Sequence, residues 1–151
     1  MVTIERSISV VLSVFIFSFY LSAQAERPTP CSNATLRGSY SFSIRGDIQP
    51  PSGPAVEIHG VALTHFDGQG NVSNTDHFVR NGTPPPVDWR PGTGSYVVHE
   101  NCTGEAHITN EGSPTLDLYF VIAERGHEVR GVVSDSGANI SANGLRVHSS
   151  F

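Results

Sequence analysis

The sequence predicts an all-β fold, an antiparallel meander of about eight strands closed into a small barrel. Short runs that alternate apolar with polar residues recur along the chain, and this is the period of a half-buried strand. Glycine and proline, 15 and 10 residues, mark the turns between the runs. No run has the length and period of an amphipathic helix, and the turns are too short for parallel crossovers.

Residues 1–25 are predicted to be a secretory signal peptide. An apolar run of about 14 residues follows a charged start, and Ala23-Gln24-Ala25 provides an A-x-A cleavage site. The run is too short for a stable membrane span, and no later run reaches the roughly 18 apolar residues that a span needs. We therefore expect one mature domain, residues 26–151, secreted to the periplasm or the extracellular space without stable membrane insertion.

The two cysteines, Cys31 and Cys102, are predicted to form a disulfide. An exported chain meets an oxidising compartment, where pairing is the default and a catalytic thiol is the rarer alternative. The bond would tie the N-terminal arm to a distant turn and, by the chain-entropy argument, add roughly 4 kcal/mol of stability.

The first strands are bounded by clear turn residues. Residues 36–48 alternate aromatic and aliphatic residues with serines and end at a proline-rich turn. Residues 56–66 are apolar on both faces, so this strand is covered on both sides or lies where the barrel meets a partner. A glycine- and asparagine-rich hairpin turn at residues 67–71 leads into a third strand, residues 72–80.

The longest stretch without a β pattern is residues 81–92, which contains three consecutive prolines and the only tryptophan, Trp89. Loops of this length in compact domains are often lids or binding loops. The alternative is a proline-stiffened connection in which Trp89 is a packing anchor, and the sequence leaves both open.

Five further runs complete the meander. They cover residues 94–99, 105–109, 115–123, 128–134 and 139–148. In one of them, leucine and phenylalanine side chains share one face while Asp117 and Tyr119 share the other. We expect the apolar face to line the interior, since the reverse arrangement would make Asp117 a buried acid with a raised pKa.

Composition excludes several classes of function. All 9 basic residues are arginine, against 14 acidic ones, so the net charge of −5 does not favour nucleic-acid binding, which needs clustered cationic charge. The absence of lysine excludes Schiff-base chemistry and a P-loop. The short signatures of serine hydrolases, zinc proteases and dinucleotide enzymes are also missing, and we expect no cofactor.

The seven histidines do not form a convincing metal site. His59 and His65 share one face of a strand but lie about 20 Å apart, too far to bind one ion. His99 and His107 face each other across a hairpin without an evident third ligand. We therefore predict no metal.

Five asparagines begin N-x-S/T sequons: Asn33, Asn71, Asn81, Asn101 and Asn139. They would accept glycans in a eukaryotic secretory pathway, or they are ordinary turn residues. The sequence leaves both readings open.

Three pieces of the chain together carry a resemblance: Cys31 followed by residues 36–42, then residues 65–73, then residues 92–96 leading into residues 101–104. They span about two thirds of the mature chain and resemble a group of small exported proteins whose fold is similar to the allene oxide cyclase or lipocalin type of barrel. Members of such barrel groups include cofactor-free cyclases that fold a polyene or polyketide in an apolar cavity, and also plain carriers. The segments are turns and strand starts, so the resemblance assigns no catalytic residue.

We therefore expect a secreted barrel that binds a small apolar molecule in its cavity and helps it to cyclise or isomerise, by holding a near-reactive conformer. Our candidate ligand-binding residues are Tyr40, Phe42, Asp76, Trp89 and Tyr96, with Asp76 as the polar group. Ordinary core packing is the alternative for the first two. The rival function is a non-catalytic extracellular carrier or interaction module with a side-chain-filled barrel, and the sequence leaves room for a homo-oligomer.

Overall fold

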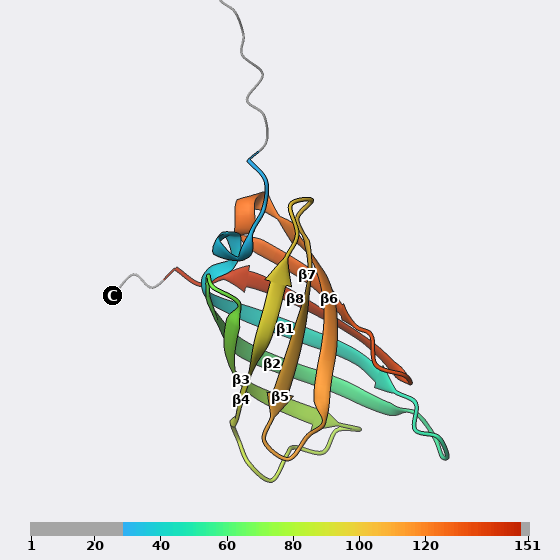
Figure 1. Ribbon diagram of the computed structural model, residues 1–151. Coiled ribbons are helices and arrows are strands. Elements are labelled where there is room, and N and C mark those ends of the chain that lie inside the picture. The colour runs from blue at the N-terminus through green and yellow to red at the C-terminus, as the bar shows by residue number, and fades with distance from the viewer. Residues whose placement is uncertain (1–28, 149–151) are drawn as a thin grey trace, which may run out of the picture.

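The computed structural model describes residues 29–148 as eight strands and two short 3₁₀ helices (Figure 1). The helices are η1 (Asn33–Leu36) and η2 (Glu124–Gly126). The strands are β1 (Arg37–Ile48), β2 (Val56–Asp67), β3 (Asn71–Arg80), β4 (Arg90–Val98), β5 (Thr103–Asn110), β6 (Thr115–Ala123), β7 (Glu128–Val133) and β8 (Ala138–Arg146). The predicted signal peptide, residues 1–25, lies outside the described residues. Neither helix within them has the length and apolar character that crossing a membrane requires.

The strands form a closed antiparallel barrel, which confirms the predicted fold class. Each strand pairs with the next along the chain, and β1 also pairs with β8. The pairing of β1 with β2 runs from Arg37 opposite Asp67 to Ile48 opposite Val56. Closure gives both sides of every strand a hydrogen-bonding partner, so the barrel avoids exposed sheet edges.

One strand begins earlier than predicted. β4 starts at Arg90 instead of residue 94, so the loop after β3 covers residues 81–89. Asp76 lies opposite Arg90 in the register, and its carboxylate accepts two hydrogen bonds from the Arg90 guanidinium. This pair holds the start of β4 against β3, although Pro91 has no N–H to contribute.

Side chains alternate between the barrel interior and its outer surface. In β6, Leu116, Leu118 and Phe120 line the interior. Tyr119 points outward and is 53% exposed, and Asp117 shares its face. This confirms the orientation expected for this strand.

The second apolar face of β2 is not covered within residues 29–148. Val61 and Leu63 lie on the outer surface and are 49% and 52% exposed. The expectation that β2 is covered on both sides is therefore wrong for the described residues, because a barrel of one sheet buries only its inner face. The other expectation, contact with a partner, stays a prediction.

The N-terminal arm closes one end of the barrel, which we term the capped end. Figure 1 shows η1 and η2 together at this end. Leu36 is completely buried there. The Tyr96 hydroxyl donates to the Asn33 carbonyl oxygen at 3.0 Å and accepts a hydrogen bond from the Gly68 N–H at 2.9 Å. Tyr96 thus fastens η1 to the turn between β2 and β3.

A second tyrosine anchors the other side of the capped end. The Tyr40 hydroxyl donates to the Gly126 carbonyl oxygen at 2.5 Å and accepts a hydrogen bond from Arg146 Nη2 at 2.8 Å. Arg146 Nη2 also donates to the Thr35 carbonyl oxygen at 2.9 Å. Burial raises the pKa of Tyr40 and of Tyr96, so both hydroxyls keep their protons for these hydrogen bonds.

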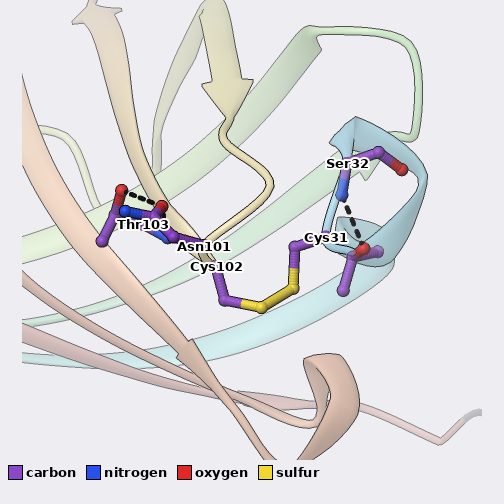
Figure 2. The surroundings of a disulfide bond; sticks show 6 residues. Cys31, Ser32, Asn101, Cys102 and Thr103 are labelled. Atoms are coloured by element: carbon purple, nitrogen blue, oxygen red, sulfur yellow. Dashed lines mark hydrogen bonds between the residues drawn. A yellow bond between two sulfur atoms is a disulfide. The ribbon is translucent and has the colours of Figure 1, made fainter. Parts of the chain in front are cut away.

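The disulfide between Cys31 and Cys102 confirms the predicted pairing (Figure 2). It ties the arm before η1 to the turn between β4 and β5, where the Cys31 N–H also donates to the Glu100 carbonyl oxygen at 3.1 Å. A disulfide is compatible with the exported location that the signal-peptide pattern predicts.

Asp67 holds the predicted hairpin turn between β2 and β3. Its Oδ1 accepts the backbone N–H groups of Gln69, Gly70 and Asn71 at 2.6, 3.0 and 3.0 Å. Its Oδ2 accepts the Asn71 side-chain amide at 2.6 Å. These hydrogen bonds, the one from the Asn71 side chain first, lower the pKa of Asp67 to about 2. The carboxylate therefore fixes this turn at neutral pH.

Other sequon asparagines also have turn contacts. Asn81 Oδ1 accepts the Glu57 N–H at 2.9 Å, and Asn101 Oδ1 accepts the Thr103 N–H at 3.1 Å, the latter visible in Figure 2. The Asn101 contact is the Asx-type hydrogen bond expected of a turn residue, whereas the Asn81 contact joins the turn after β3 to β2. Glycan attachment stays a prediction.

We predict that the double substitution Cys31→Ser and Cys102→Ser lowers the free energy of unfolding by up to about 4 kcal/mol, because a loop with a sequence separation of 71 is then open in the unfolded chain. Urea unfolding followed by circular dichroism measures the loss. The spectrum before unfolding should stay that of a β-protein, since the strand ladders do not need the bond. A loss below about 1 kcal/mol would contradict the loop-closure argument.

Candidate functional site

The barrel encloses a cavity of about 70 Å³. Side chains from every strand except β4 line it, and they are mostly apolar. The residues of β4 that face inward beside the cavity are Gly92 and Gly94, which have no side chain. They belong to the same alternating set as the buried Tyr96. An apolar cavity of roughly 150 Å³ holds benzene, and drug-sized ligands occupy roughly 300–1,000 Å³. The cavity therefore has room for a group of only a few heavy atoms.

The cavity lies toward the end of the barrel opposite η1, which we term the open end. Figure 1 shows the loop between β3 and β4 and the turn between β5 and β6 at this end. Apolar side chains here are only partly buried: Ile44, Ile48, Val56, Phe78, Leu116, Leu118 and Ala138. The open end thus exposes apolar surface that the capped end conceals.

A second hollow, which we term the vestibule, lies at the open end and measures about 470 Å³. Its walls are residues 83–87, residues 111–113 and the side chains of Phe78, Arg80 and Arg90. Phe78 borders both the vestibule and the cavity. Gly60 lies opposite Phe78 in the register, and a Cβ at Gly60 would overlap the Phe78 ring. Phe78 therefore forms part of the wall of both spaces, and its position depends on a glycine.

A buried ion pair lies between the cavity and the vestibule. Asp76 is 2% exposed, and its two oxygens accept hydrogen bonds from Arg90 Nε at 2.9 Å and Arg90 Nη2 at 3.0 Å. Arg90 Nη1 donates to Ser113 Oγ at 2.6 Å, and the guanidinium lies 5.4 Å from the centre of the Phe78 ring. Burial raises the pKa of Asp76, while the hydrogen bonds and charge of Arg90 oppose this effect.

A row of polar side chains crosses the barrel wall next to this pair, two residues from Asp76 along β3. Thr64, Asn74, Gly92 and Asn110 lie opposite one another on β2, β3, β4 and β5. Thr64 Oγ1 donates to Asn74 Oδ1 at 2.8 Å, and Asn74 Nδ2 donates to Asn110 Oδ1 at 3.4 Å. A Cβ at Gly92 would lie 2.6 Å from Asn110 Nδ2. The glycine therefore lets the two amides meet over β4.

The structure separates the five candidate ligand-binding residues. Phe42 and Asp76 line the cavity. Tyr40 and Tyr96 lie at the capped end, outside the cavity lining, where their hydroxyls bond to backbone groups. Trp89 is 56% exposed, and its ring lies tilted against that of His77, with ring centres 5.8 Å apart. Such exposure does not fit a core anchor. Ligand contact stays a prediction for all five.

Sequence reasoning missed five residues of this site: Thr64, Asn74, Phe78, Arg90 and Asn110. The alternation did contain a signal for four of them. Asn110 continues the inward set of Ala106 and Ile108, and Thr64 shares its set with the buried Ala62 and Phe66. On β3, Asn74 precedes Asp76 by two residues and Phe78 follows it by two. Arg90 carried no such signal, because it fell within a predicted loop.

The nearest acid and histidine pair of the described residues lies on the outer surface. His107 Nδ1 and Asp117 Oδ1 are 2.6 Å apart, and both side chains are about half exposed. The hydrogen bond with Asp117 raises the pKa of His107. Across residues 29–148 no three His, Cys, Asp or Glu side chains come together as metal ligands would.

We predict that Arg90→Gln destabilises the barrel by roughly 3–5 kcal/mol at pH 7, because it leaves the buried Asp76 carboxylate without its cationic partner. An acid whose folded-state pKa is raised loses stability as the pH rises above its unfolded-state pKa. Arg90→Gln removes the charge and the guanidinium hydrogen bonds that do most to lower this pKa. The loss should therefore shrink between pH 7 and pH 4.5, as thermal melts at both values will show.

Two variants control this experiment. The double variant Asp76→Asn with Arg90→Gln should recover part of the stability at pH 7, since no buried charge remains. Arg130→Gln breaks an exposed pair with Glu128 and should change little, because the Arg130 side chain is 63% exposed. An equal loss for Arg90→Gln at both pH values would contradict the assignment to Asp76.

The chain matches no protein-family model, and searches of curated proteins and of solved structures found no match. What the structure supports of the resemblance is its architecture: eight antiparallel strands in a meander, closed into a barrel.

Proposed function

We propose that this protein is a secreted barrel that binds a small, largely apolar molecule through its open end. The supporting observation is the apolar cavity behind Phe78, which adjoins a vestibule edged by partly exposed apolar side chains. Covering such surface is favourable by about 25 cal/mol per Å². Kinship with allene oxide cyclase-like or lipocalin-like barrels, and export guided by residues 1–25, are part of this proposal.

The dimensions favour a slender ligand. A narrow apolar part would enter the 70 Å³ cavity, and the remainder would occupy the 470 Å³ vestibule. Pro84, Pro85 and Pro86 line the vestibule, and their fixed φ angles limit the entropy lost when this wall closes on a ligand. Arg80 and Glu111 supply a polar rim at the vestibule, as is common in small-molecule sites.

Ligand binding is better supported than catalysis of a reaction. Asp76 is the single carboxylate among the described cavity-lining residues, and Arg90 occupies both of its oxygens. A proton transfer from a substrate would require Asp76 to exchange Arg90 for that substrate. We therefore favour a carrier or binding module over a cyclase or isomerase. Association with a second copy of the chain stays a prediction.

We predict that 1-hexene binds to the native protein and that Ala106→Leu weakens this binding at least tenfold. Ala106 lines the cavity, and the larger side chain would fill the space. The overpacking should reduce stability by about 1–3 kcal/mol without unfolding the barrel. Titration of 1-hexene, followed by the NMR methyl signals of Ile108 and Leu118, measures the affinity.

The matched control is Thr93→Leu, which adds a leucine to the outer surface of β4, where Thr93 is exposed. This variant should bind 1-hexene like the native protein. Equal binding by Ala106→Leu would place the ligand outside the cavity. No binding of 1-hexene to the native protein, together with no small molecule retained in native mass spectrometry after purification from the host, would overturn the proposed function.

A further inference from the structure

The side-chain amides of Asn74 and Asn110, inside the barrel, can form more hydrogen bonds than residues 29–148 provide. A primary amide has two N–H donors and an oxygen with two lone pairs. Asn74 accepts one hydrogen bond from Thr64 and donates one to Asn110, and Asn110 donates one to the Arg90 carbonyl oxygen. Within the described structure, each amide thus keeps one N–H and one lone pair without a protein partner.

Both amides face the cavity and are shielded from bulk water. Asn74 is 8% exposed and Asn110 is 3% exposed, and both belong to the cavity lining. The hydrogen bonds that Asn74 and Asn110 donate are each 3.4 Å long, beyond the usual 2.7–3.2 Å. Bonds of this length are weak, so a polar group in the cavity can take their place.

The fold does not need polar side chains at this level. Backbone ladders already join β3, β4 and β5, and the other walls of the cavity are apolar, with Phe42, Leu118 and Phe120 among them. Burying an amide with incomplete hydrogen bonding lowers stability. One polar spot on an otherwise apolar wall is the usual composition of a small-molecule site.

We propose that the ligand carries one hydroxyl or carbonyl group, which hydrogen-bonds to Asn74 and Asn110 while its apolar part packs against the opposite wall. The inference rests on the proposed function, because it names the ligand chemistry of the same cavity. A hydroxyl donates to Asn110 Oδ1 and accepts from Asn74 Nδ2, whereas a carbonyl accepts from the two amide N–H groups. Asp76, two residues along β3, does not compete, since Arg90 holds both its oxygens.

A pair of ligands with equal chain length tests this selectivity. In the native protein, 1-hexanol should bind roughly tenfold or more tightly than 1-hexene, because the hydrocarbon leaves the buried amides unpaired. The side-chain amide signals of Asn74 and Asn110 in ¹H–¹⁵N spectra should shift with 1-hexanol and not with 1-hexene. Titrations of both ligands, with these signals and the cavity methyl groups as readouts, give the two affinities.

Asn110→Leu replaces the amide by an apolar side chain of similar size. It should abolish the preference for 1-hexanol while 1-hexene still binds. Asn143→Leu is the matched control, because Asn143 is exposed on the outer face of β8. This variant should keep the native preference. If Asn110→Leu does not fold, Asn74→Leu removes the other amide of the same pair and carries the same expectation.

The outcomes separate this inference from the proposed function. Equal affinity for 1-hexanol and 1-hexene overturns the amide assignment and leaves apolar binding intact; the amides then bind water. A preference for 1-hexanol that survives in both leucine variants also overturns the assignment. No binding of either ligand to the native protein overturns the proposed function itself.

Discussion

The pairing of β1 with both β2 and β8 is the constraint on which the rest of the structure depends. It closes the sheet, so each strand has one inner and one outer face and no strand can slip without moving its neighbours. A slip of one residue would turn every inward side chain outward. The cavity, the Asp76–Arg90 pair and the polar row across β2 to β5 all require this closed register.

The two ends of the barrel use opposite solutions for their polar and apolar groups. At the capped end, Tyr40 and Tyr96 bind backbone carbonyl oxygens, and the disulfide secures the arm that covers them. At the open end, apolar side chains remain partly exposed and a buried ion pair borders the opening. The contacts that hold the arm in place are thus concentrated at one end, and the other end is the one through which we propose that a ligand enters.

The two sides of the barrel interior also differ in polarity. β6, β7 and β8 contribute apolar side chains, whereas β2, β3 and β5 bring Thr64, Asn74 and Asn110 together across Gly92. A wall of this kind holds an apolar body by dispersion and orients one polar group by hydrogen bonds. In the proposed binding site, this arrangement would distinguish ligands of equal size by their polar group.

Local pattern by itself determined the β class, most turn positions and the inward face of β6, because alternation and turn chemistry act over a few residues. The cysteine pairing was predicted from the count of two cysteines and the expected export. Local pattern did not place Tyr40 and Tyr96 at the capped end, nor pair Arg90 with Asp76. Alternation tells which face a side chain occupies, but its height along the barrel depends on the register of strands distant in sequence. Asn74 and Asn110 meet only because that register sets Gly92 between them, and this the tertiary structure alone decided.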